Sequence, residues 1–171
     1  DNLLQPLLGE LLSMEDAIST LNDCFDVYGS SPHFLSDWRW YKEIHGEAGS
    51  YNQYAINAYR RNIHNLLDYR YVYPEITPEN GTALKDNCAI IYELAKKMPE
   101  HTRAETGLIV SHLHDLHQAI PPTAAQTAQA LEEYIEALKS YRRGEKYTPH
   151  LARFCSWFGS GQQYLSFLRR K

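Results

Sequence analysis

Apolar side chains recur three to four positions apart along most of the chain, and stretches in which apolar and polar residues alternate are nearly absent. This spacing is typical of amphipathic α-helices, which bury one stripe of side chains. Valine, a residue type favoured in strands, occurs only at positions 27, 72 and 110. We therefore predict an all-α fold: a compact bundle of six to eight mostly antiparallel helices joined by short loops.

Capping residues, prolines and glycines mark the ends of the predicted helices. Ser13 and Gly29 bracket one long helix, and Thr77-Pro78 begins another. The predicted helices cover residues 3–12, 13–28, 32–45, 51–69, 78–98, 102–120, 123–143 and 149–158. Between them, residues 70–77 are expected to form an extended connector or a very short strand. Residues 162–171 are expected to form a final short helix or an extended arm.

The size of the chain predicts one domain. Its 171 residues, 43% of them hydrophobic and 22% charged, lie within the range of a single globular domain. We expect one helical domain over residues 1–171, with 159–171 as a mobile basic tail. No apolar run reaches the roughly 18 residues of a membrane span, so we expect no membrane association. Cys24, Cys88 and Cys155 lack the spacing of a disulfide framework or a zinc site, which favours a cytoplasmic location.

Three histidines lie close together in the segment 111–117. Histidine is a common metal ligand, but at about 100° per helical residue only His114 and His117 share a face. A pair at this spacing needs carboxylates from another helix to complete a site, and H-x-x-H often occurs without a metal. We therefore predict no metal and no cofactor.

A polar stripe along the predicted helix 51–69 is the candidate ligand site. Asp68 lies one turn after His64 and could fix the tautomer of its imidazole, while Arg60 or Arg61 could hold an anionic group. The alternative is a solvated helix face with weak ion pairs. The candidate residues are Asn57, Arg60, Arg61, His64 and Asp68, with Trp38 and Tyr41 from the preceding helix.

Aromatic residues are concentrated between positions 38 and 73. One helix face cannot bury them all, and tyrosine and tryptophan are enriched where proteins bind one another. This region is therefore predicted to line a pocket or a partner contact. A tyrosine-rich edge of the core is the alternative.

The charge is unevenly distributed along the chain. The formal net charge is −4, but residues 139–171 carry eight basic residues and one acidic residue, a net +7. The remainder carries nine basic and twenty acidic residues, a net −11. Basic residues interleaved with aromatic ones can bind single-stranded nucleic acid, although a basic segment can equally contact an acidic protein surface. The candidate contact residues are Arg142, Arg143, Lys146, Arg153, Arg169, Arg170 and Lys171.

These observations leave three hypotheses about function. No complete catalytic constellation is present, which favours a non-enzymatic interaction module or a subunit of a larger assembly. Such a module would bind a protein partner, or a second copy of itself, through residues 38–73 and the basic segment 139–171. The first alternative is a small nucleic-acid-binding subunit that uses the basic segment. The second is an enzyme or ligand-binding domain with an aromatic-lined pocket around Arg61, His64 and Asp68.

Overall fold

The computed structural model describes residues 12–33, 50–66, 72–97, 106–144, 151–156 and 163–170. Over these residues the fold is mostly helical, with five α-helices, two short 3-10 helices and one two-stranded antiparallel sheet. The prediction of an all-α bundle of six to eight helices is therefore wrong. Residues 25–28 were expected in a helix and residues 164–169 in the C-terminal tail. They belong to two strands that pair with each other. None of the described helices is long and apolar enough to cross a membrane.

The helices begin and end largely where their capping residues predict. The side chains of Ser13, Ser50 and Thr77 each accept a hydrogen bond from the backbone N–H three residues later, and Gly144 ends a helix with a left-handed φ of 77°. The elements are α2 (Met14–Leu21), β1 (Phe25–Ser31), α3 (Tyr51–Asn62), η1 (Ile63–Leu66), α4 (Pro78–Lys96), α5 (Thr106–Ala119), η3 (Pro122–Ala124), α6 (Ala125–Arg143) and β2 (Tyr164–Arg169).

The largest departure from the prediction lies in residues 13–28, expected as one helix. The helix stops at Leu21, and Phe25–Ser31 forms β1, paired antiparallel with β2. Val27 lies opposite Phe167 and is fully buried. Phe25 and Tyr28 have helical spacing, but this local pattern does not decide their structure. The segment forms a strand because it pairs with β2, which comes from the other end of the chain.

Other predicted segments also differ. Ser31 is the last residue of β1, and neither Pro32 nor His33, where the helix was expected to begin, is helical. Residues 152–156 form a turn rather than part of a helix, whereas 72–77 form the expected irregular connector. The predicted helix 3–12 and residues 34–45 lie outside the described residues.

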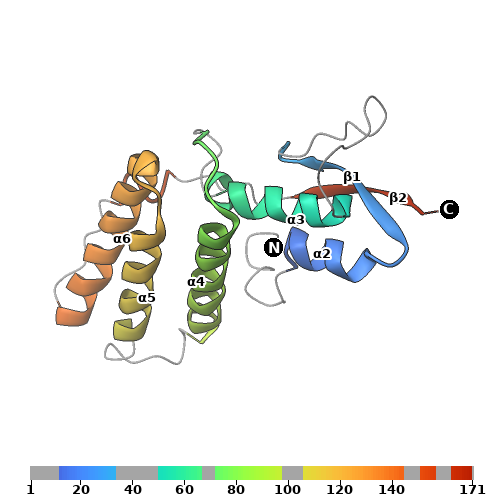
Figure 1. Ribbon diagram of the computed structural model, residues 1–171. Helices are drawn as coiled ribbons and strands as arrows, with labels where there is room; N and C mark the ends of the chain where they lie inside the picture. Colours follow the sequence, from blue (N-terminus) through green and yellow to red (C-terminus); the bar gives the residue numbers. More distant parts are fainter. Residues whose placement is uncertain are drawn as a thin grey trace.

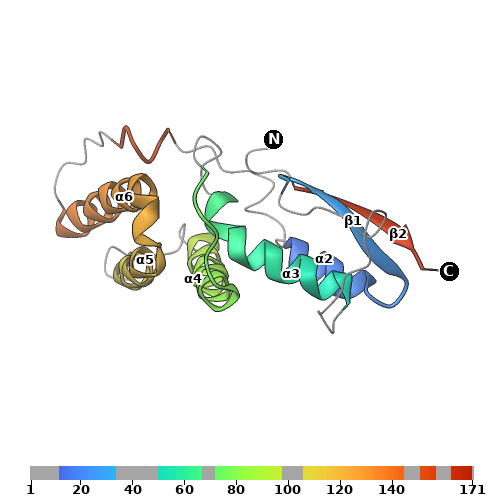
Figure 2. The ribbon, with the colours of Figure 1, turned by 45° about the horizontal axis from the view of Figure 1, so that its top comes forward.

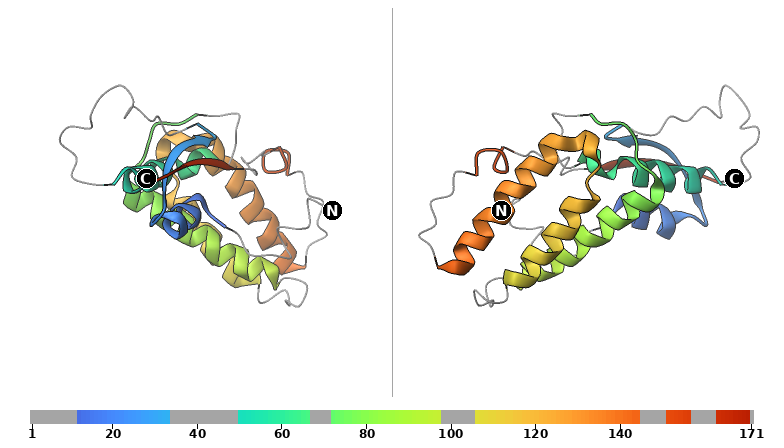
Figure 3. Two further views of the ribbon diagram at one scale, coloured as in Figure 1. Left: turned by 90° about the vertical axis from the view of Figure 1, so that its right-hand side faces the viewer. Right: turned by 60° about the vertical axis from the view of Figure 1, so that its left-hand side comes forward.

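The chain builds two hydrophobic clusters. Helices α4, α5 and α6 lie side by side as one layer (Figures 1 and 3) and surround the first cluster. From α4, α3 extends toward α2 and the sheet at the opposite end of the molecule (Figure 1), where the second cluster lies. The helical cluster contains Leu84, Ile109, Val110, Leu113, Leu116, Ile120, Ala124, Leu131, Ile135 and Leu138; the sheet cluster contains Ile18, Val27, Tyr51, Ala55, Ile56 and Ala58.

A close helix crossing joins the two parts. Gly81 on α4 lies directly against the backbone of Arg60 on α3: a Cβ at Gly81 would lie only 1.7 Å from the carbonyl oxygen of Arg60. Glycine is therefore required for this approach of α4 to α3. The crossing fixes the position of the helical layer relative to α3 and the sheet.

Candidate functional site

The polar stripe of α3 connects three helices. Arg60 donates from Nε to Glu15 Oε2 of α2 at 3.3 Å, and Lys85 Nζ of α4 donates to the same oxygen at 3.2 Å. The hydrogen bond from Arg60 lowers the pKa of Glu15, against the opposing effect of burial, and the reciprocal bond raises the pKa of Arg60. The Arg60 guanidinium is thus engaged by a carboxylate of the same chain.

Its neighbours on the stripe also have partners within the chain. Arg61 Nε lies 3.2 Å from Glu75 Oε2, and its guanidinium lies 5.9 Å from the ring centroid of Tyr54. Asn57 accepts a hydrogen bond from Gln53.

His64 is buried, with 1% of its surface exposed. Its Nε2 donates to the carbonyl oxygen of Pro74 at 3.0 Å, and its ring stacks on Tyr73. Nδ1 has no hydrogen-bond partner among the described residues. Burial lowers the pKa of His64, which favours the neutral imidazole at neutral pH. Asn65 also binds the connector 72–77. Its side-chain amide accepts from the backbone nitrogen of Tyr73 and donates to the backbone oxygen of Tyr73.

The structure thus brings Arg60, Arg61 and His64 onto neighbouring turns but directs them to Glu15, Glu75 and Pro74. These contacts hold α2 and the connector 72–77 in place. The remaining members of the predicted ligand set, Asp68, Trp38 and Tyr41, lie outside the described residues. A ligand site around Arg61, His64 and Asp68 stays a prediction.

The described tyrosines of region 38–73 belong mainly to the core. Tyr51 and Tyr59 are 6% and 5% exposed, and burial, followed by the nearby Glu15 carboxylate, raises the pKa of Tyr59 to about 12. Tyr73 packs against the helical cluster, and its hydroxyl donates to Gln126. These rings therefore offer little surface for a partner.

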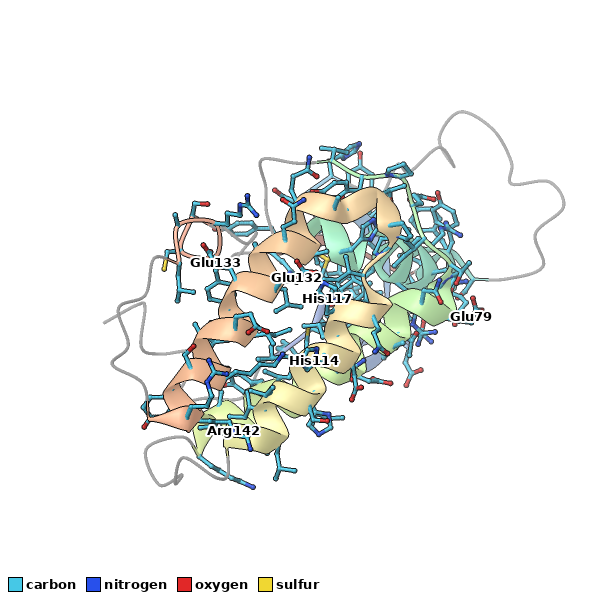
Figure 4. All side chains as sticks on the ribbon, turned by 90° about the vertical axis from the view of Figure 1, so that its left-hand side faces the viewer. Glu79, His114, His117, Glu132, Glu133 and Arg142 are labelled. Atoms are coloured by element: carbon cyan, nitrogen blue, oxygen red, sulfur yellow. The ribbon has the colours of Figure 1, made fainter. Side chains whose placement is uncertain are left out.

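The histidine segment lies on α5, beside acidic residues of α6 (Figure 4). His117 Nε2 lies 3.0 Å from Glu132 Oε1. Within the described ranges, no three histidine, cysteine, aspartate or glutamate residues gather as a metal site. The neighbouring Glu133 instead accepts from the backbone nitrogens of Arg153 and Phe154, both at 2.9 Å, and anchors the turn 152–156 on α6.

The basic residues of segment 139–171 are divided between distant parts of the fold. Arg142 and Arg143 lie at the C-terminal end of α6, whereas Arg169 and Arg170 belong to β2 or follow it, and these elements lie at opposite ends of the molecule (Figure 1). Arg170 is also neutralised by Asp26, whose Oδ1 lies 2.8 Å from Nη2. The described basic residues therefore do not form one continuous patch. Arg153 lies in the turn 152–156, and Lys146 and Lys171 lie outside the described residues.

The first strand of the sheet is protected along its outer edge by a side chain. Asn52 of α3 is 1% exposed; its Oδ1 accepts from Val27 N and its Nδ2 donates to Phe25 O, both at 2.8 Å. These are the groups that an added strand would bond. The Asn52 amide therefore replaces a third strand beside β1.

On the outer edge of β2, no described side chain bonds the backbone in this way. Figure 2 shows β1 between β2 and the helices α2 and α3, with β2 at the margin of the molecule. Backbone groups alternate between the two edges of a strand. Arg170 N donates to the carbonyl oxygen of Cys24, the residue just before β1. The backbone N–H and C=O groups of Leu168 and Ser166, two and four positions earlier, therefore also face β1. Those of Leu165, Phe167 and Arg169 face outward, and none of them bonds to another residue in the part of the chain that the structure describes.

Large apolar side chains flank this edge. Tyr164 and Leu168 on β2 are 62% and 50% exposed, and Tyr28, the extra residue at the bulge of β1, is 53% exposed. On the opposite face of β2, Leu165 and Phe167 pack on the sheet cluster. An unpaired edge beside exposed apolar side chains is a surface on which another chain can add a strand.

Sequence reasoning named Arg169 but missed Leu165, Phe167 and Asn52. The signal for the strand is the alternation of Leu165 and Phe167 with Tyr164, Ser166 and Leu168, which matches their burial. The alternation is too short to exclude an amphipathic helix. Nothing in the sequence indicates that Asn52 lies against β1.

Comparison with protein-family models, curated protein sequences and solved structures finds no match to this chain. Any functional conclusion must therefore come from its own geometry.

Proposed function

We propose that this chain is a protein-interaction module that binds an extended segment of a protein partner along the outer edge of β2. The observation that carries the proposal is the asymmetry between the two edges of the sheet. Asn52 bonds two backbone groups on the outer edge of β1, while the backbone groups of Leu165, Phe167 and Arg169 face outward without partners among the described residues. The sheet has two strands and packs on α2 and α3, and a third strand would add hydrogen bonds along the outer edge of β2.

The basic segment 139–171 was predicted to bind a protein partner. This proposal keeps that role and assigns it to β2 alone. It is better supported than nucleic-acid binding, because the basic residues on α6 and on β2 are far apart and Arg170 is paired with Asp26. It is better supported than a ligand pocket, because Arg60 and His64 already bind groups of this chain. A reducing, cytosolic setting is part of the proposal, in keeping with the free thiols of Cys24, Cys88 and Cys155.

A peptide-display selection tests the proposal, with the whole chain as bait. The selected peptides are then measured against Arg169→Pro. Proline lacks the outward N–H, and its ring obstructs the edge, while the bonds between β2 and β1 remain. We expect Kd to rise at least about tenfold. The matched control is Arg169→Gln, which loses the charge but keeps the N–H, and it should change Kd less than about threefold.

Hydrogen exchange of the bound chain locates the contact. The amides of Leu165, Phe167 and Arg169 should gain protection when a selected peptide binds. The proposal fails if the selected peptides bind Arg169→Pro as tightly as the natural chain and leave these amides unprotected.

A further inference from the structure

We infer that the segment which adds to β2 is β2 of a second copy, so that two chains join through a continuous four-stranded sheet in the order β1-β2-β2-β1. The inference rests on the proposed function and specifies its partner. Three features of β2 support it: the arrangement of its outward groups, the position of its charges, and the side chains that would face each other.

A two-fold axis through Phe167 would let the outward backbone groups of Leu165, Phe167 and Arg169 all form hydrogen bonds with the second copy. Two copies of one strand related by a two-fold axis perpendicular to the sheet run antiparallel. With Phe167 opposite its own counterpart, Leu165 of each chain lies opposite Arg169 of the other. All of these residues direct their backbone groups outward, so each of them finds a hydrogen-bonded partner.

The charges of β2 favour this direction. Arg169 lies at one end, next to Arg170, which is paired with Asp26, while the other end, at Gln163 and Tyr164, is uncharged. Antiparallel pairing about Phe167 places the two Arg169 residues four positions apart, about 14 Å along the sheet, which exceeds the screening length of about 8 Å at physiological salt. Parallel pairing in register would place them about 4.8 Å apart. Repulsion between the two Arg169 residues therefore disfavours the parallel dimer more than the antiparallel one.

The facing side chains are also compatible. On the outer surface, the exposed Leu168 of one chain would lie beside Ser166 of the other. Tyr164 would lie beside Arg170 of the other chain, where an arginine can rest on the aromatic face. On the inner surface, the two Phe167 rings would meet across the axis and extend the sheet cluster of each chain, which Phe167 already contacts.

A disulfide experiment tests this register. In a background of Cys24→Ser, Cys88→Ala and Cys155→Ser, one chain carries Ser166→Cys and another carries Leu168→Cys. The two positions form a non-hydrogen-bonded pair, with Cα atoms about 4.5 Å apart, which suits a disulfide. Position 166 lies diagonally from its own counterpart, about 8 Å away, too far for a disulfide. We expect a cross-linked dimer when the two variants are mixed, and little from either variant alone.

Sedimentation measures the association without cross-linking. The whole chain should form dimers with increasing concentration up to about 1 mM, which would reveal even a dimer with a Kd of about 1 mM. Arg169→Pro should be monomeric, whereas Arg169→Gln should still associate. A chain that stays monomeric at this concentration, a dimer that persists in Arg169→Pro, or cross-linking that does not depend on mixing would each overturn the inference.

The outcome also separates this inference from the function on which it rests. If the chain is monomeric but selected peptides bind in an Arg169→Pro-sensitive manner, the edge binds a different protein, and only the second copy is excluded. If neither dimers nor edge-dependent peptides are found, both proposals fail.

Discussion

The side-chain amide of Asn52 binds β1 as a peptide group of a neighbouring strand would. Its Oδ1 lies 2.8 Å from the nitrogen of Val27, in a buried position 25 residues away along the chain. The same amide donates to Phe25 O, and also to Asn22 Oδ1. One side chain thus satisfies a donor and an acceptor on one edge of β1. Among the described residues, none bonds the outward backbone groups of β2.

Replacement of Asn52 by alanine should destabilise the protein. The substitution removes the hydrogen bonds to the buried N–H of Val27 and to the part-buried carbonyl of Phe25, and the buried N–H alone costs about 1–3 kcal/mol when it loses its bond. Urea denaturation measures the change in the free energy of unfolding. Asn57→Ala is the matched control on the same helix, because Asn57 is half-exposed and its bond is to Gln53; it should change stability by less than about 0.5 kcal/mol. Equal effects of the two substitutions would contradict the role of Asn52.

Gly81→Ala should loosen the crossing of α3 and α4. The new methyl group would overlap the Arg60 carbonyl, and because both are backbone-anchored, the helices must move apart. Overpacking of this kind costs about 1–3 kcal/mol or more, which thermal denaturation would detect. Gly29→Ala is the control, since no atom lies within 4 Å of the added Cβ and its φ is not positive. Unchanged stability in Gly81→Ala would show that the crossing is less close than described.

Glu15 should make stability depend on acid pH. Its pKa in the folded chain is held below the ordinary value of 4.5, chiefly by the hydrogen bond from Arg60. The unfolded chain therefore binds a proton first as the pH falls. The contribution of Glu15 is present above pH 4.5 and is lost as the pH falls through the lowered pKa of the folded state. Glu15→Gln should be less stable at pH 7 and should lose less stability on acidification.

Denaturant titrations from pH 7 to about pH 3 would measure this difference. Glu93→Gln serves as the control, because Glu93 forms an exposed pair with Lys96 within α4 and such pairs contribute little. An acid profile of Glu15→Gln that parallels the natural chain would contradict the assignment.

His64 should add a second pH dependence, nearer neutrality. Burial lowers its pKa from the ordinary value of 6.5, outweighing the opposite effects of Pro74 O and the Glu75 carboxylate. Between pH 6.5 and the lowered value, the unfolded chain binds the proton that the folded chain excludes. Stability should therefore fall as the pH drops below 6.5. His64→Gln removes this titration and should flatten the profile in that window. A persistent slope in His64→Gln would assign the effect to another group.

Local sequence was sufficient for the starts of α2, α3 and α4 and for the end of α6, but not for the end of α2 at Leu21. Ser13, Ser50 and Thr77 cap helices because their side chains reach a backbone N–H three residues away. Gly144 ends α6 because it adopts a left-handed φ. Each of these interactions is complete within one turn of chain, so no distant segment is needed to predict it.

Only part of the candidate site could be predicted from the sequence. Arg169 and Arg170 stood out by their charge, but sequence placed them in one basic segment with Arg142 and Arg143. The fold separates them, because β2 pairs with a strand near the other end of the chain. Arg170 meets Asp26 across 144 positions, a contact that no local spacing indicates.

The sequence by itself thus determined the helical segments that depend on neighbours within a few residues. Tertiary structure decided which residues became strands, that Asn52 would bond two groups on one edge of the sheet, and that no described segment would pair with the outer edge of β2. The physical reason is that a strand, unlike a helix, takes its hydrogen bonds from another segment. The identity of that segment depends on how the whole chain folds.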